Sequence, residues 1–214
     1  MGKSKQPREF WGLDFETSGT THENHAPIQL GICAPDGAWR SWYVKPDWYW
    51  RDQCGDKPMH GEDLCKEWDP DAFKVHGIER ELLETEGKTR ATISAEAVAF
   101  IVQHSKTWHG ERKLVGWNVG SFDAPFLRQY FPGIALKLSY QSADLNAVCF
   151  AISEANGDGY RDIKRAAQEY GGERARVLFG TDSPDTWKLH DAGYDAIAAL
   201  GAWDYLKERI AYGY

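Results

Sequence analysis

The chain has 214 residues, of which 42% are hydrophobic and 27% charged, and this composition is typical of a soluble protein with one globular domain. Its net charge of −7 at pH 7 argues against the strongly basic surface with which many proteins grip long duplex DNA. No run of about 18 apolar residues occurs, so the sequence predicts neither a membrane-spanning helix nor a membrane partner.

Residues 1–8 are basic and polar and lack the apolar stretch of a secretory signal. We therefore expect a disordered tail over 1–8 and a single domain over 9–214.

The cysteines favour a reducing compartment. The four of them, which show no paired spacing, are Cys33, Cys54, Cys65 and Cys149. We expect free thiols and a cytoplasmic location. The alternative is a zinc site that uses Cys54, His60 and Cys65, but no fourth ligand has a suitable spacing.

The segment Phe10–Thr17 predicts an apolar strand that ends in two carboxylates. Asp14 and Glu16 are two residues apart, so on a strand their side chains lie on the same face. Two adjacent like charges raise each other's pKa unless a cation lies between them. Mg²⁺ prefers carboxylate oxygens and fits such a pair, whereas the alternative is a strand that leads into an acidic loop.

Two further strands follow the polar loop 17–26. Residues 28–33 and 39–44 have strand-like composition, and Pro35-Asp36-Gly37 between them is a hairpin signal. The chain therefore begins with an antiparallel meander whose first strand carries the carboxylates.

Residues 46–71 show no lasting period of 2 or 3.6, and we interpret them as a Trp-rich insertion without regular structure. The aromatic side chains could stack on bases or pack as a small satellite core, and packing is the interpretation we favour. These side chains are Trp48, Tyr49, Trp50 and Trp68.

The rest of the chain alternates helices and strands, which predicts a mixed sheet flanked by helices. The expected elements are helices over 73–83 and 92–104, a strand over 113–118, a helix from Asp123 to near Pro132, a strand over 142–144, and helices ending near 154, over 160–170 and over 190–212.

Asp123, His190 and Asp195 extend the acidic pair. Asp123 follows a glycine loop at a strand end, where ligands gather in open α/β sheets. Asp195 is five residues after His190, so both side chains can reach one cleft. Each residue alone also fits an ordinary role, such as a first-turn acid favoured by the helix dipole. Their joint occurrence with Asp14 and Glu16 favours catalysis.

Four segments resemble the signatures of the DEDD exonuclease superfamily. They are Phe10–Thr17, Val75–Ile78, Leu114–Leu127 and His190–Ala196, and they are spread over nearly the whole chain. A histidine five residues before the last aspartate is typical of the DEDDh subclass. The insertion at 46–71 has no counterpart in this resemblance.

The resemblance implies a ribonuclease H-like three-layer α/β fold, with a mixed five-stranded sheet that begins as an antiparallel meander. It also implies 3′-to-5′ exonuclease activity on single-stranded or frayed DNA, with release of nucleoside monophosphates and two Mg²⁺ ions as cofactors, for which Mn²⁺ could substitute. Such an enzyme would suit DNA repair, proofreading beside a polymerase, or nucleic-acid turnover.

The resemblance also implies a role for each site residue. Asp14 would bridge both ions, Glu16 and Asp195 would complete one, and Asp123 would serve the other. His190 would accept a proton from the attacking water, which suits an imidazole near neutral pH. The residues expected to contact the terminal nucleotide are Thr17, Ser18, His76, Asn118 and Phe122.

Alternatives stay open on the sequence alone. The same chemistry could act on RNA, because no residue is an evident reader of the 2′-hydroxyl. A non-catalytic module that binds nucleic acid or a polymerase would be expected to lack a carboxylate or the histidine. A purely structural acidic domain would not be stabilised by Mn²⁺. We expect a monomer or a homodimer.

Overall fold

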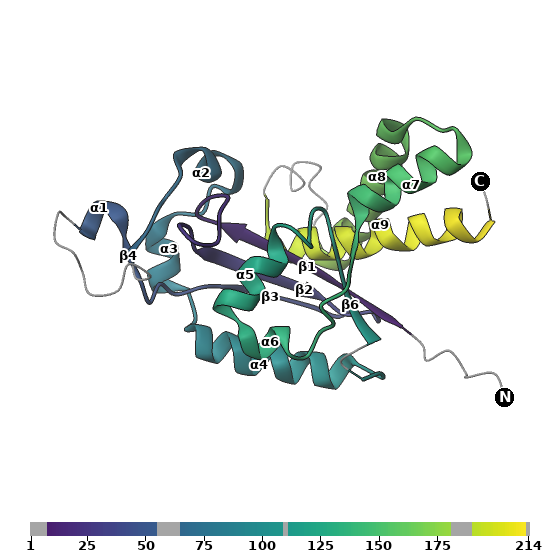
Figure 1. Ribbon diagram of the computed structural model, residues 1–214. Coiled ribbons are helices and arrows are strands. Elements are labelled where there is room, and N and C mark those ends of the chain that lie inside the picture. The colour runs from purple at the N-terminus through teal and green to yellow at the C-terminus, as the bar shows by residue number, and fades with distance from the viewer. Residues whose placement is uncertain (1–7, 55–64, 109–110, 181–189, 213–214) are drawn as a thin grey trace.

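The computed structural model describes residues 8–54, 65–108, 111–180 and 190–212. A five-stranded mixed sheet forms its centre (Figure 1), in the order β3-β2-β1-β6-β7. Strands β1, β2 and β3 form an antiparallel meander, and β6 and β7 run parallel to β1. The predicted sheet is therefore confirmed. Its strands are β1 (Glu9–Thr17), β2 (Pro27–Cys33), β3 (Trp39–Tyr43), β6 (Arg112–Gly116) and β7 (Ser142–Asp144).

Helices cover both faces of the sheet and complete three layers (Figure 1). One hydrophobic core joins the sheet to the first group of helices, which comprises α4 (Arg90–His104), α5 (Asp123–Tyr130) and α6 (Pro132–Ala135). A second core lies on the other face, under α7 (Leu145–Asn156), α8 (Tyr160–Phe179) and α9 (Ala192–Tyr212). No helix of the described residues is both long and apolar enough to cross a membrane.

Strand β1 divides its side chains between the two faces. Trp11, Leu13 and Phe15 are buried in the first core, so alternation directs Asp14 and Glu16 toward the α9 face. Helix α9 lies directly on the sheet there because β2 offers a glycine. A Cβ atom at Gly31 would lie 1.8 Å from the Ala192 carbonyl oxygen. This close approach brings the first turn of α9 to the carboxylates of β1.

The Trp-rich insertion contains short elements rather than none. They are β4 (Tyr49–Trp50), α1 (Arg51–Cys54), β5 (Cys65–Lys66) and the start of α2 (Pro70–His76), which is followed by α3 (Arg80–Thr85). Trp48 and Trp50 are buried in the first core, so packing is the correct interpretation for these two side chains. They extend the main core and do not form a satellite.

The prediction of free cysteines is wrong for one pair, because Cys54 and Cys65 form a disulfide. Strand β4 pairs in parallel with β5, which places the helical turn that ends at Cys54 beside Cys65. Neither sulfur is then available to a zinc ion, and His60 lies outside the described residues. Cys33 and Cys149 are free and buried, as expected.

Two predicted helices have different lengths in the structure. The helix expected over 73–83 is two helices, because Gly77 takes a left-handed conformation (φ 66°) and ends α2. The helix expected over 160–170 continues to Phe179. Its glycines do not end it but permit close packing, since a Cβ atom at Gly171 would lie 2.2 Å from the Ala198 carbonyl oxygen of α9.

Candidate active site

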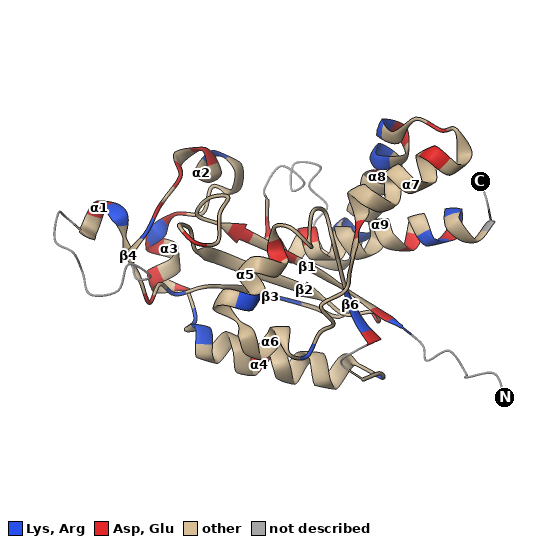
Figure 2. Ribbon diagram, in the orientation of Figure 1, with Lys and Arg blue, Asp and Glu red and all other residues tan. Residues whose placement is uncertain are grey.

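A cavity of about 290 Å³ opens at the carboxyl end of β1, and all four predicted carboxylates and the predicted histidine line it. Figure 2 shows red acidic segments at this strand end and at the first turn of α5. The predicted residues at the cavity wall are Asp14, Glu16, Thr17, His76, Phe122, Asp123, His190 and Asp195. The structure thus brings together residues from β1, α2, α5 and the start of α9.

Asp123 is fixed by a hydrogen bond to the first strand. Asp123 as a residue is only 2% exposed, and its Oδ1 accepts from the Phe15 N–H over 3.0 Å. Asp123 is the first residue of α5, where the helix dipole favours a negative charge. The bond holds this carboxylate against the segment that carries Asp14 and Glu16.

Glu16, His190 and Asp195 form a tight donor cluster. One ligand atom from each of these side chains lies within 4.8 Å of the other two. The His190 Nδ1 is 3.8 Å from the Asp195 Oδ2, and 52% of the His190 side chain is exposed. Two carboxylates and an imidazole at this spacing can share a divalent cation.

Burial is the main cause that raises the pKa of each of the four carboxyl groups when no cation is present. Burial, and then the charges of its acidic neighbours, raises the pKa of Asp14 well above its ordinary value. Burial is also the main cause that raises the pKa of Glu16 to about 9 and of Asp195 to about 7. The pKa of Asp123 rises to about 8 through burial, against the lowering effect of the Phe15 N–H.

This electrostatic pattern fits a pair of hard cations. Carboxylates buried side by side destabilise their own charged forms, and a divalent ion removes that penalty while using the same oxygens as ligands. The donor set of Asp14, Glu16, Asp123 and Asp195 consists of oxygens only, which is the set that Mg²⁺ and Mn²⁺ prefer.

Two residues that the sequence analysis did not assign orient the start of α9. The Asp191 Oδ1 accepts from the N–H groups of Gly193 and Tyr194, at 2.9 and 3.1 Å, and so caps the helix. The Gln29 amide on β2 donates to the Asp191 Oδ2 over 2.7 Å and accepts from the Ala192 N–H over 3.1 Å. A polar side chain within an otherwise apolar strand was the available signal for Gln29.

Of the neighbours Thr17 and Ser18, only Thr17 is accessible to a substrate in the cavity. Thr17 lines the cavity. Ser18 is fully buried and lies outside the cavity wall, and its hydroxyl donates to the Glu67 carbonyl oxygen over 2.7 Å and accepts from the Ala26 N–H over 3.0 Å. The structure therefore gives Ser18 a tethering position, away from the place expected for a terminal nucleotide.

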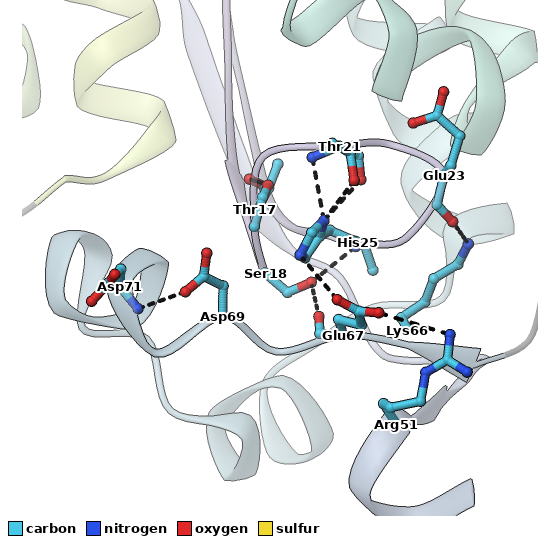
Figure 3. A network of polar contacts seen from close by, with 12 residues as sticks. Thr17, Ser18, Thr21, Glu23, His25, Arg51, Lys66, Glu67, Asp69 and Asp71 are labelled. Carbon is cyan, nitrogen blue, oxygen red and sulfur yellow. Dashed lines mark hydrogen bonds and ion pairs between the residues drawn. The ribbon is translucent and has the colours of Figure 1, made fainter.

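The Trp-rich insertion holds the loop that contains Ser18 (Figure 3). The Lys66 ammonium donates to the Glu23 carbonyl oxygen over 2.7 Å, and the Asp69 N–H donates to the Ser18 carbonyl oxygen over 2.7 Å. Asp69 then caps α2, the helix that carries His76 to the cavity. One segment thus positions two parts of the cavity wall.

His76 has a hydrogen-bond donor without a partner. Its Nδ1 accepts from the Ile78 N–H over 2.9 Å, so the neutral ring carries its proton on Nε2. That Nε2 is buried and has no hydrogen-bond partner among the described residues. Burial, and then the charge of His190, lowers the pKa of His76 to about 4. The ring is a neutral N–H donor at the cavity wall.

Two aromatic rings and an amide complete the region. Phe122 and Trp117 line the cavity, and the sequence did not assign Trp117 a contact with the terminal nucleotide. Asn118 lies outside this wall and lines a second, neighbouring cavity, with its backbone in the left-handed region (φ 59°).

Solved structures with the same fold share little sequence with this chain. The zinc-bound form of the E. coli exonuclease I complex with single-stranded DNA has 19% identity and a TM-score of 0.61, covering 97% of this chain and 42% of that one. The E. coli exonuclease I complex with a dT13 oligonucleotide has 19% identity and a TM-score of 0.62, covering 95% and 42%. Product-bound exonuclease I has 18% identity and a TM-score of 0.61, covering 96% and 45%.

The comparisons confirm the ribonuclease H-like fold. The chain spans less than half the length of these exonuclease I structures. No protein-family model matches the sequence, and no curated protein matches it.

Proposed function

We propose that the protein is a metal-dependent exonuclease of the DEDDh type that removes nucleotides from the 3′ end of single-stranded DNA. The observation that carries this proposal is the convergence of four carboxylates and one imidazole on a single cavity. The shared fold with E. coli exonuclease I, whose structures hold DNA oligonucleotides, supports DNA as the polymer.

Two Mg²⁺ ions are the cofactors that this donor set fits, with Mn²⁺ as a substitute. Asp14, Glu16 and Asp195 would hold one ion, and Asp14 and Asp123 the other. When bound, such ions neutralise the charge that develops on the phosphate and acidify an attacking water.

The protein's own side chains supply proton transfer and positioning. His190 accepts the proton of the attacking water, and its exposure at the rim lets it return that proton to solvent. The His76 Nε2–H donates to an oxygen of the terminal nucleotide, which provides the partner that this buried group lacks among the residues that the structure describes. Phe122 packs against the last base, and Thr17 contacts the 3′-hydroxyl end.

The test is digestion of a 5′-labelled single-stranded DNA with Mg²⁺, with Mn²⁺ and with EDTA, beside a matched RNA and a matched duplex. We expect a ladder that shortens from the 3′ end, requires the metal, and is faster on single-stranded DNA. Preferred digestion of the RNA would reassign the substrate. Absence of metal-dependent cleavage on every substrate would refute the proposed enzyme.

A further inference from the structure

A second cavity, of about 830 Å³, extends from the candidate active site along α8. We call it the α8 groove. It shares Asp14, Trp117, His190 and Asp195 with the first cavity, so the two spaces meet at these side chains. A polymer whose end occupies the first cavity therefore has a continuous path into the second.

Charge is distributed unevenly between the two spaces. The shared end is acidic, whereas Lys164, Arg165 and Arg176 of α8 line the groove beyond it. Glu169 and Glu173 also line the groove, so it is mixed rather than uniformly basic. Beyond the shared end, three cations face two carboxylates, so this part of the groove is locally positive in a chain whose net charge is −7, and a local positive charge favours an anionic chain.

Lys164 and Arg165 are available to phosphates. Arg165 pairs with Asp162 over 2.8 Å, and Arg176 pairs with Glu173 over 2.6 Å, and all four side chains are exposed. Exposed pairs of this kind contribute about 0–1 kcal/mol and exchange partners readily. Within the described parts of the chain, Lys164 forms no ion pair, and its ammonium lies 5.3 Å from the centre of the Trp117 ring.

Trp117 provides a flat surface where the two cavities meet. Its side chain is partly exposed and lines both spaces. Tryptophan stacks on bases of any sequence, at about 1–3 kcal/mol for each base, but only if the base is unpaired. A stacking residue at this junction therefore favours a single strand.

An ordered amide follows Trp117 in the chain. The Asn146 amide donates to the Asn118 Oδ1 over 2.8 Å, and the Tyr160 hydroxyl donates to the Asn146 Oδ1 over 3.0 Å. These bonds hold the Asn118 side chain at the groove and leave its own N–H donors for a base or a phosphate. The sequence prediction that Asn118 contacts nucleic acid is consistent with this position.

We propose that the α8 groove binds the single strand on the 5′ side of the terminal nucleotide, with Trp117 stacking on a base and Lys164 and Arg165 contacting successive phosphates. This inference rests on the proposed function, because the strand direction follows from a 3′ end in the first cavity. It predicts that substrate length matters beyond the nucleotide that is removed.

The test compares two substrates in the full chain. The p-nitrophenyl ester of thymidine 5′-monophosphate reports on the first cavity alone, whereas dT12 uses the groove as well. In the Lys164→Ala/Arg165→Ala variant, the ratio of kcat/KM for dT12 to kcat/KM for the ester should fall about tenfold, mainly through KM. Arg161→Ala, an exposed residue of the same helix outside the groove wall, is the matched control.

A binding measurement tests the role of the α8 groove independently of the proposed exonuclease activity. Fluorescence anisotropy with labelled dT12 and Ca²⁺ needs no turnover. Loss of two phosphate contacts should weaken binding and reduce the slope of log K against log salt by about 1.4, because single strands release about 0.7 ion per contact. If the variant binds dT12 like the wild type, with the same salt slope, the groove does not bind the strand, even if the protein is an active exonuclease. If the variant binds dT12 more weakly but neither protein cleaves DNA, the groove binds the strand and the proposed exonuclease activity is refuted.

Discussion

The Phe15 N–H donates to the Asp123 Oδ1 over 3.0 Å, and this bond joins the strand of the first two carboxylates to the helix of the third. An asparagine at position 123 can keep the bond, because its amide oxygen also accepts. We therefore expect Asp123→Asn to fold normally while losing about 10³-fold in kcat, since a metal ligand contributes several kcal/mol to charge stabilisation in such reactions. Digestion of labelled dT12 measures this loss.

The expected control outcome for Asp123→Asn is a melting temperature in EDTA equal to or above that of the wild type, because a neutral amide replaces a carboxyl group whose charged form is disfavoured by burial. Wild-type kcat in the variant would show that Asp123 does not hold a required ion.

Metal-free stability should depend on pH through Glu16. Its pKa in the folded protein is about 9, above the ordinary value of 4.5, because of burial and then the charges of Asp195 and its neighbours. Between these two values the folded state keeps a proton that the unfolded state has released. The free energy of unfolding that Glu16 contributes is therefore full below about pH 4.5 and is lost as the pH rises toward 9.

The Glu16→Gln variant isolates this effect. In EDTA, the melting temperature of the variant minus that of the wild type should increase from pH 5 to pH 8, by about 2–4 °C for each kcal/mol. Mn²⁺ should stabilise the wild type most at the high-pH end, where the carboxylates need it. The exposed Glu154→Gln variant is the control. A difference in melting temperature that does not change with pH would contradict the raised pKa.

His76 should remain neutral to about pH 4. Burial and the nearby charge of His190 lower its pKa, and the Ile78 N–H occupies its Nδ1. Nitrogen-15 NMR of the imidazole should show the Nε2–H tautomer, with no titration until the pH falls to about 4. A midpoint near 6.5 would exclude a buried donor. On oligonucleotides, His76→Phe should raise KM, because the substrate loses that donor.

The first carboxylates were predictable because strand alternation is local. Asp14 and Glu16 share a face whatever the rest of the chain does, and the glycine loop before Asp123 also marks its own position. The convergence with Asp195 depends on tertiary packing instead. It requires a glycine at position 31, because any side chain there would collide with the backbone of α9. The spacing of residues along the chain does not predict this contact.

The parts that sequence reasoning missed depend on contacts between distant residues. The Cys54–Cys65 bond follows from the pairing of two-residue strands that are too short to show a period. Gly171 is typical of a helix end until the Ala198 carbonyl is placed against it. The position of Trp117 between two cavities could not be predicted, because many of the residues that line the second cavity belong to α8, which is distant in sequence.

Gln29 should act as a positioning residue for the start of α9, which carries Asp195. It donates to Asp191 and accepts from the Ala192 N–H, so it sets the direction of the first turn of α9. Gln29→Ala leaves these buried groups without a partner, at a cost of about 1–3 kcal/mol in stability. It should also weaken Mn²⁺ binding several-fold and lower kcat.

Titration calorimetry with Mn²⁺ distinguishes positioning from general destabilisation of the fold. Gln103→Ala, an exposed glutamine on α4, should leave metal affinity unchanged. Wild-type Mn²⁺ affinity in Gln29→Ala, together with reduced stability, would assign Gln29 a structural role only.

The Cys54–Cys65 disulfide should affect substrate binding as well as stability. It closes a short loop with a sequence separation of 11, which corresponds to about 3 kcal/mol by the loop-closure relation. Cys65 of the disulfide is followed by Lys66, and the Lys66 ammonium donates to the Glu23 carbonyl oxygen in the loop at the cavity wall. The Cys54→Ser/Cys65→Ser variant should therefore melt at a lower temperature and show a higher KM for dT12, with a smaller change in kcat because the carboxylates lie on other elements.

Reductant should reproduce both effects in the wild type and have no further effect in the variant. Identical melting and KM values in oxidised and reduced protein would mean that the hydrogen bonds of Lys66 and Ser18 are sufficient to hold the loop.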